Sequence, residues 1–374
     1  MRGQFPLDPE RAQFAAFVLS PHTAPLQAAI DGYRDELATD TEAALLTGLE
    51  REGAVRAAAA GFAGGSPDQY ALTDSTTMGI ATMYGGLSLG PGDEVLTTTH
   101  DFYSTEASLD LLARRTGAQV KRVTLYDEPA AADPNQMMAR LLDGIGPRTK
   151  VVAVTWVHSS TGVRLPIQEM AGVIATVGAR RGDPMVFCVD GVHGFGAVDV
   201  DLPDLGCDFL ATGTHKWLFG PRGTGILWAR DWAPLTELIP SFSGPGGGAN
   251  RLTHGGYHAF EHQWAAADAF DLMGRIGRDR VATRTTEQAT RLKEGLAEVT
   301  GVRVVTPMAP EVSAGIVCLE VPGLMPANAV LELRDSGIVA SATPYAASYL
   351  RLGPSIATTP EQVDAAVAAV ADLA

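Results

Sequence analysis

Cysteine is scarce in this sequence. Only three cysteines occur among 374 residues, Cys188, Cys207 and Cys318, and none of them forms a CxxC pair. Each lies in an apolar run, which indicates a reduced, buried side chain rather than a disulfide framework or a cysteine-based metal site. We therefore expect a cytoplasmic protein.

Positive charge and long apolar runs are scarce as well. The chain has 28 Lys and Arg residues against 43 Asp and Glu, a formal net charge of −15. This balance argues against a nucleic-acid partner or an anionic membrane surface, but it leaves room for one local basic pocket. No apolar stretch has the length needed to span a membrane, and the start, MRGQFPLDPERAQF, lacks the apolar run of a signal peptide.

Two apolar runs each lead to a residue that can take part in chemistry. Residues 185–189 end on Asp190, and residues 207–211 lead to Thr214-His215-Lys216. A lysine amine can form an imine with an aldehyde cofactor. An acid at a strand end would keep the ring nitrogen of that cofactor protonated, so that the ring draws electrons. For Lys216 alone, a buried lysine paired with a carboxylate is the more common explanation.

The order of apolar and amphipathic segments predicts the architecture. Strand and helix patterns alternate up to about Trp228, which predicts a mostly parallel, doubly wound sheet. From Arg280 onward the pattern is helix, two strands, helix, two strands and helix, which indicates a compact α+β domain. No GxGxxG follows the first strand, and GPRGTG has the wrong spacing, so a dinucleotide-binding fold is not supported.

Two long segments resemble the class V aminotransferases. DGVHGFGAVDVDLPDLGCDF is similar to the strand-acid segment of that family, and GTHKWLFGPRGTGILW is similar to its Schiff-base lysine segment. These are pyridoxal 5′-phosphate (PLP) enzymes of fold type I, and they include cysteine desulfurases and isopenicillin N epimerases. The resemblance extends over nearly the whole chain and is greatest for the epimerase-like and C–S lyase-like branch.

The resemblance implies an α/β protein with the fold type I PLP-dependent transferase fold. A large, doubly wound, mostly parallel-sheet domain would be joined to a smaller α+β C-terminal domain. We expect an N-terminal arm (residues 1–40) that contributes to the small domain, a large PLP-binding domain (41–248) and a small domain (249–374). The Gly-rich stretch SFSGPGGGANRLTHGG marks the transition. The family implies a homodimer with active sites at the interface.

The resemblance also implies roles around the cofactor. Lys216 would bond the cofactor aldehyde and serve as base and acid, Asp190 would pair with the ring nitrogen, and Phe102 would stack on the ring. The phosphate would be held by Ser75, Thr76, Thr214 and His215, and the phenolic oxygen by His193 and Ser159. Viewed alone, the Ser/Thr cluster is a simple helix N-cap, and an aromatic residue at a strand end more often belongs to the core.

Substrate-binding residues are implied in the same way. Arg351, in the closing segment YLRLGPSIATTPEQVD, would bind the carboxylate of an amino-acid substrate through two parallel hydrogen bonds. A surface arginine on an edge strand is the alternative. Further substrate-binding candidates are His22, Tyr103 and His258, and a second acid would come from Tyr103, His158 or His258. Although His254, His258 and His262 recur every fourth residue, no acid or cysteine completes a motif, so we expect no metal site.

We therefore expect a PLP enzyme that acts at Cα or Cβ of a modified amino acid in specialised metabolism, by C–S β-elimination or by epimerisation. Desulfuration through a persulfide is disfavoured, because IVASATPYAASY has no cysteine where desulfurases need one. An aminotransferase and a decarboxylating oxidase remain open. So does a non-catalytic PLP-fold binding module, although the joint presence of Lys216 and Asp190 argues against it.

Overall fold

The computed structural model describes residues 2–241, 247–253 and 255–374. His254 and residues 242–246 of the predicted Gly-rich transition lie outside the described residues. Among the helices of these three ranges, none is long and apolar enough to cross a membrane.

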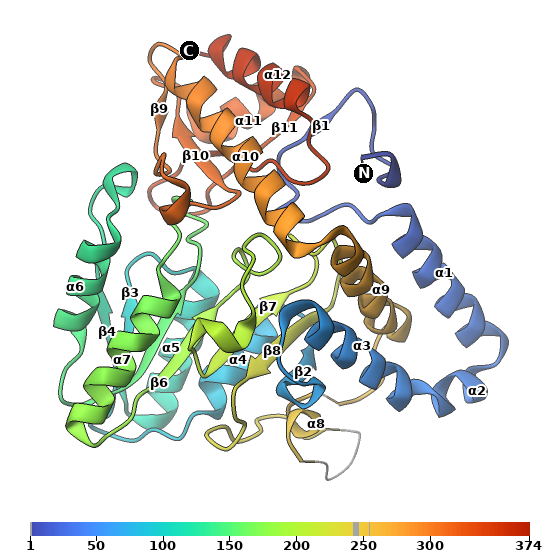
Figure 1. Ribbon diagram of the computed structural model, residues 1–374, viewed down its shortest axis with the longest axis vertical. Helices are drawn as coiled ribbons and strands as arrows, with labels where there is room; N and C mark the ends of the chain where they lie inside the picture. Colours follow the sequence, from blue (N-terminus) through green and yellow to red (C-terminus); the bar gives the residue numbers. More distant parts are fainter. Residues whose placement is uncertain (1, 242–246, 254) are drawn as a thin grey trace.

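A seven-stranded sheet forms the centre of the molecule (Figure 1). In spatial order its strands are β2 (Tyr70–Thr73), β8 (Gly225–Ala229), β7 (Phe209–Gly213), β6 (Val186–Asp190), β5 (Thr149–Thr155), β3 (Glu94–Thr98) and β4 (Gln119–Val123). The five strands from β7 to β4 run parallel, and β8 is antiparallel to both of its neighbours. The predicted mostly parallel sheet is therefore confirmed.

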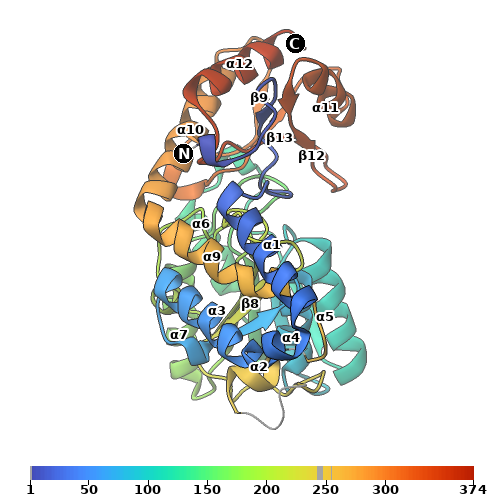
Figure 2. The same cartoon turned by 90° about the vertical axis from the view of Figure 1, so that its right-hand side faces the viewer.

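Helices cover both faces of this sheet. One face carries α4 (Thr76–Gly86) and α5 (Tyr103–Thr116), and the other carries α3 (Gly48–Ala63), α6 (Pro134–Gly144), α7 (Ile167–Arg181) and α9 (Phe260–Ile276). Figure 2 shows α5 and α7 on opposite sides. In β5, Val151 and Ala153 pack toward α4 and α5, whereas Val152 and Val154 pack toward α7. Successive strand side chains point to opposite faces, so both faces need apolar residues, and this explains the unbroken apolar runs.

The C-terminal part forms a second, smaller layer. Its antiparallel sheet has the order β12 (Ser341–Ala342), β13 (Leu350–Leu352), β10 (Val317–Glu320) and β9 (Arg303–Val304). The helices of this part are α10 (Arg278–Ala297), α11 (Pro326–Asp335) and α12 (Pro360–Ala371). The smaller α+β domain is thus confirmed, and it lies above the large sheet in Figure 1.

The N-terminal segment connects the two parts. Strand β1 (Ala12–Gln13) pairs with β11 (Ile338–Val339), and further along the segment Ser20 donates two hydrogen bonds, from N–H and Oγ, to the His215 carbonyl (2.9 Å each). The other helices of the N-terminal half and the transition are α1 (Ala24–Thr39), α2 (Thr41–Leu46) and α8 (Ala249–Leu252). Because α9 packs on α1 and α3, helices from both sides of residue 248 share one core. The domain boundaries themselves stay a prediction.

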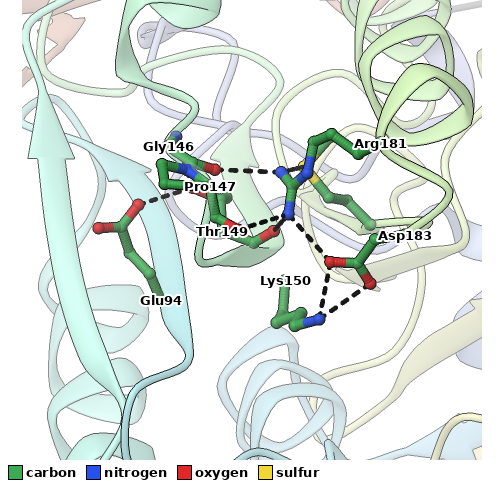
Figure 3. Close-up of polar contacts among 8 residues, drawn as sticks. Glu94, Gly146, Pro147, Thr149, Lys150, Arg181 and Asp183 are labelled. Carbon is green, nitrogen blue, oxygen red and sulfur yellow. Dashed lines mark hydrogen bonds and ion pairs between the residues drawn. The ribbon is translucent and has the colours of Figure 1, made fainter.

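The amino ends of the parallel strands are held by a cluster around Arg181 (Figure 3). Its guanidinium donates hydrogen bonds of 3.0–3.1 Å to three backbone carbonyls of the approach to β5, those of Gly146, Pro147 and Thr149. Asp183 accepts from Arg181 (3.0 Å) and from Lys150 (2.7 Å). This edge of the sheet is thus occupied by structural polar contacts.

The Arg181 cluster gives a stability prediction. Arg181→Met is expected to lower the free energy of unfolding by about 1–3 kcal/mol, because three backbone carbonyls lose a charged donor. Equilibrium urea unfolding measures the change. Arg180→Met, at the exposed neighbouring position, is the matched control, and equal effects of the two substitutions would contradict the prediction.

Candidate active site

A cavity of about 300 Å³ lies at the opposite edge of the sheet, where β3, β5, β6 and β7 end. The predicted site residues that line it are Phe102, Ser159, Asp190, His193, His215, Lys216 and Arg351. Parallel strands bring their carboxyl ends to one edge, and this is where open α/β sheets bind ligands. Residues from positions 102 to 351 therefore meet in one place.

Lys216 is presented by a tight loop between β7 and β8. The loop is closed by hydrogen bonds from Phe219 N–H to the Lys216 carbonyl (3.0 Å) and from Gly220 N–H to the Thr214 carbonyl (2.8 Å). Phe219 has a φ of 56°, in the left-handed region that non-glycine residues rarely adopt. A Cβ at Gly220 would lie 2.7 Å from Thr214, so only glycine allows the loop to close. The backbone that carries Lys216 is thus tightly constrained.

His193 faces the Lys216 amine. Its Nε2 lies 3.3 Å from Lys216 Nζ, and its Nδ1 accepts a hydrogen bond from the Trp217 indole N–H (3.3 Å). Burial lowers the pKa of His193 well below 6.5, and the charges of Lys216 and Arg351 lower it further. A neutral imidazole that accepts at Nδ1 must carry its proton on Nε2. His193 therefore presents an N–H group to the amine.

The Lys216 amine and the Asp190 carboxylate are held in a poorly solvated site. Burial lowers the pKa of Lys216 below its ordinary 10.5, and the charge of Asp190 offsets only part of that shift. Burial also raises the pKa of Asp190 above 3.8, although the Val192 N–H, 3.1 Å from Oδ1, favours the charged form. A lowered lysine pKa increases the fraction of neutral amine, which is the nucleophilic form.

The start of α4 offers a place for a phosphate. Ser75 caps the helix by accepting from the Met78 N–H (3.1 Å), and the Thr76 hydroxyl is buried with no partner among the described residues. A Cβ at Gly213 would lie 2.7 Å from His215 and 3.0 Å from Thr76 Oγ1, so Gly213 lets these two side chains approach each other. A helix N-terminus, an unpaired hydroxyl and an imidazole together fit an anion. The Thr214 hydroxyl, by contrast, bonds to Thr224 within the loop.

Arg351 reaches the cavity from β13. Its three guanidinium nitrogens donate to the Ser159 carbonyl (3.1 Å), the Ser341 hydroxyl (3.2 Å) and the Ala342 carbonyl (3.0 Å). It is 7% exposed and lies over the Phe17 ring, 5.1 Å from the centroid. Within the described ranges no carboxylate forms an ion pair with Arg351. Buried charges are normally paired, so this guanidinium suits an anionic ligand.

Several predicted residues do not line the cavity. Tyr103 is 66% exposed at the start of α5 and contacts the Phe102 ring (4.1 Å between centroids). His158 is completely buried and bonds through Nδ1 to the Tyr126 hydroxyl (2.8 Å). His22 is buried, and His258 lies 3.6 Å from Asp74. No group of three His, Cys, Asp or Glu side chains in the described part of the chain is arranged to hold a metal ion.

Comparison with known proteins places this site in a family. A family model described as Aminotransferase class-V matches residues 50–365. The chain belongs to this family.

The chain is similar in sequence to an epimerase and to a probable cysteine desulfurase. It is 28% identical over 330 residues to isopenicillin N epimerase of Streptomyces clavuligerus, covering 80% of the chain and 79% of the relative. It is 29% identical over 271 residues to a probable cysteine desulfurase of Xylella fastidiosa, covering 67% and 61%.

Solved structures show the same fold. The cystine C–S lyase C-DES, in complex with its reaction product cysteine persulfide, has a TM-score of 0.89 at 23% identity and covers 99% of the chain and 100% of that structure. A C-DES mutant with glycine covalently linked to the PLP cofactor has a TM-score of 0.90 at 22% identity, with full coverage of both chains. The predicted family, fold type I architecture and PLP cofactor are therefore confirmed, and the chain is a PLP-dependent class-V enzyme. The roles of individual residues stay predictions.

The cavity also contains residues that sequence reasoning missed. His100 lines it and stacks on Tyr126 (3.9 Å between centroids), and burial lowers the pKa of His100 to about 3. Its position two residues before Phe102 was the available signal. Phe17 and Tyr345 line the cavity as well, from the N-terminal segment and the β12–β13 loop, and no local motif marks either of them.

Proposed function

We propose that this class-V enzyme eliminates a sulfur leaving group from Cβ of an α-amino acid. One observation carries the proposal: the cavity contains a lysine of lowered pKa, a buried acid and an arginine, and among the described residues no carboxylate pairs with this arginine and no cysteine lines the cavity. The carboxylate of an amino-acid substrate could thus bind the arginine while its Cα–H faces the lysine amine, both in the same cavity.

Each side chain would have a defined task. Arg351 would bind the substrate carboxylate through the donor positions that its backbone contacts leave open. Lys216 would hold the cofactor and then, as the neutral amine, take the proton from Cα. Bound PLP would supply the electron sink that stabilises negative charge at Cα, with Asp190 at its ring nitrogen. The His193 Nε2–H would donate to an oxygen near the Lys216 amine.

The cysteines support elimination over desulfuration through an enzyme persulfide. Cys188, Cys207 and Cys318 are all 0% exposed. Burial raises the pKa of Cys207 and of Cys318 to about 12, and that of Cys188 well above 9.0. The thiolate is the nucleophilic form of cysteine, so none of the three can attack a bound substrate near neutral pH. Sulfur would therefore leave with the eliminated group.

Epimerisation at Cα is the second candidate. Two relatives named isopenicillin N epimerase, from Streptomyces clavuligerus and Amycolatopsis lactamdurans, are 28% and 27% identical to the chain. Epimerisation would use the same Lys216 base and carboxylate site, but it would need a second proton donor on the other side of Cα and no leaving group.

A panel of amino acids separates these reactions. The PLP-loaded enzyme would be incubated with cystine, S-alkylcysteines and unsubstituted amino acids, and assayed for keto acid, ammonia, thiol and optical rotation. Pyruvate and ammonia are expected in equal amounts, together with an equal amount of thiol from the S-alkylcysteines and of cysteine persulfide from cystine. Inversion without pyruvate would favour epimerisation, and keto acid formation without ammonia would favour transamination. Oxygen consumption with release of CO₂ would indicate a decarboxylating oxidase, and an inert PLP-loaded protein a binding module.

The lowered pKa of Lys216 predicts how PLP loading depends on pH. Only the neutral amine attacks an aldehyde, so the loading rate of the apoenzyme should rise with pH and level off well below the 10.5 of an ordinary lysine. Stopped-flow absorbance measures the rate, and Nα-acetyl-lysine with PLP is the control. A profile identical to that of the control would contradict the prediction.

A further inference from the structure

We infer that Tyr345 is the proton donor to the sulfur that leaves Cβ. The inference rests on the proposed function and names a catalytic residue for it. Tyr345 lies in the loop between β12 and β13, at the wall of the cavity that the C-terminal domain contributes. Lys216 comes from the large sheet, so the proposed base and the proposed acid belong to different layers of the molecule.

Ser159 connects Tyr345 to the proposed carboxylate site. Its hydroxyl lies 2.6 Å from the Tyr345 hydroxyl, and its backbone carbonyl accepts from Arg351 (3.1 Å). Because Ser159 contacts both Arg351 and Tyr345, a carboxylate bound to Arg351 would lie near the Tyr345 hydroxyl. In an α-amino acid only Cα separates the carboxylate carbon from Cβ. The leaving atom on Cβ would thus come within reach of the Tyr345 hydroxyl.

The contact with Ser159 leaves the Tyr345 proton available. The Ser159 hydroxyl can donate to the tyrosine oxygen, and the phenol O–H is then directed to a third group. Burial raises the pKa of Tyr345 to about 12, so the phenol is protonated at neutral pH. A phenol in this state serves as an acid and not as a base. The Phe102 ring, 6.0 Å from the Tyr345 ring in an edge contact, helps to fix its orientation.

The other candidate acids are less suitable. Tyr103 is exposed outside the cavity, and His158 is buried behind it. Nδ1 of His193 accepts a hydrogen bond from Trp217, and Nε2 of His193 faces the Lys216 amine. Burial keeps the pKa of His100 at about 3, and its ring is stacked on Tyr126. Among the described residues that line the cavity, Tyr345 is therefore the best-placed acid for a leaving group.

The step can be written with all atoms accounted for. The Lys216 amine takes the Cα proton, and the released electron pair forms a Cα–Cβ double bond. The Cβ–S bond breaks, and its electron pair goes to sulfur. Tyr345 gives its proton to that sulfur, so a neutral thiol leaves. The ammonium proton of Lys216 returns to the tyrosinate through water, and one further water converts the remaining three-carbon fragment to pyruvate and ammonia.

The test compares a poor and a good leaving group. Tyr345→Phe should lower the elimination rate of S-ethylcysteine by about 10²–10⁴-fold, but that of S-(4-nitrophenyl)cysteine by only about threefold, since an acidic thiol needs little help from a general acid. Tyr349→Phe is the matched control, because Tyr349 lies in the same loop but does not line the cavity. It should change neither rate.

Two measurements do not depend on elimination. The PLP affinity and visible spectrum of Tyr345→Phe should equal those of the parent enzyme. With tyrosine labelled by ¹³C at Cζ, the NMR signal that Tyr345→Phe removes should not titrate between about pH 6 and pH 10, because the phenol must stay protonated. A titration within this range would overturn the inference.

The outcomes separate this inference from the proposed function. Equal rate losses for both leaving groups, or no loss for S-ethylcysteine, would overturn the role of Tyr345 while elimination by the enzyme stands. If the parent enzyme binds PLP but releases no thiol from either compound, the proposed elimination fails first. The inference about Tyr345 falls with it.

Discussion

Lys216→Ala is expected to lower elimination by about 10⁴-fold or more, because one substitution removes both the amine that bonds the cofactor and the base at Cα. Reduction with borohydride should leave a pyridoxyl group on Lys216 of the parent enzyme and on no lysine of the variant. Peptide mass mapping gives this result, and thiol release gives the rate.

A second buried lysine, Lys293, can be compared with Lys216. Lys293 also has a pKa lowered by burial to about 8, so a lowered pKa alone does not identify the reactive amine. However, Lys293 is 1% exposed and donates hydrogen bonds of 2.8 Å to the carbonyls of Pro307 and Met308 and to the Ser313 hydroxyl. Lys293 holds α10 against a loop and does not line the cavity that contains Lys216.

Lys150→Ala is the matched control, since Lys150 pairs with Asp183 at the far edge of the sheet (Figure 3). This variant should keep the pyridoxyl label and the full rate. A label on Lys293 or Lys150, or thiol release that survives in Lys216→Ala, would contradict the assignment of Lys216.

Much of the large sheet could be predicted from local sequence, because its strands are covered on both faces. Residues 151–154 of β5 and residues 186–189 of β6 are all apolar, and each of these strands ends at a polar group, Thr155 or Asp190. Thr155 and Asp190 form the last pair between these two strands, so the end of an apolar run also locates the edge of the sheet that carries the site. Asp190 and Lys216 were found for this reason, and the cavity contains both.

Residues brought in by tertiary contacts could not be predicted in this way. Tyr345 and Ser159 contact each other through their hydroxyls although they lie 186 positions apart in the sequence. Phe17, in the N-terminal segment, contacts the guanidinium of Arg351 in β13. Neither aromatic residue belongs to a periodic pattern, because its surroundings come from other parts of the chain. His158 shows the opposite case: its loop was predicted, but its side chain points into the core, where Tyr126 binds it.

Asp190→Asn should lower elimination by about 10²–10³-fold, the cost of removing one preorganised charge from a buried catalytic site. Asparagine keeps the shape of the side chain and can still accept the Val192 N–H. It cannot keep a ring nitrogen protonated, so the cofactor would lose its capacity to take up negative charge from Cα. The rate of Cα–H exchange in D₂O, followed by NMR with alanine, measures this loss without the leaving-group step.

The same substitution should act on Lys216 in the opposite direction. The Asp190 charge raises the pKa of Lys216, so its removal should lower that pKa further and shift the pH profile of PLP loading to lower pH. Asp190→Asn would thus load PLP readily near neutral pH and yet exchange Cα–H slowly. Asp208→Asn, at a half-buried carboxylate that binds the Phe187 N–H (2.7 Å) beside the sheet, should change neither property. If Asp190→Asn slowed loading and exchange equally, the role of Asp190 would be to stabilise the structure of the site rather than to keep the ring nitrogen of the cofactor protonated.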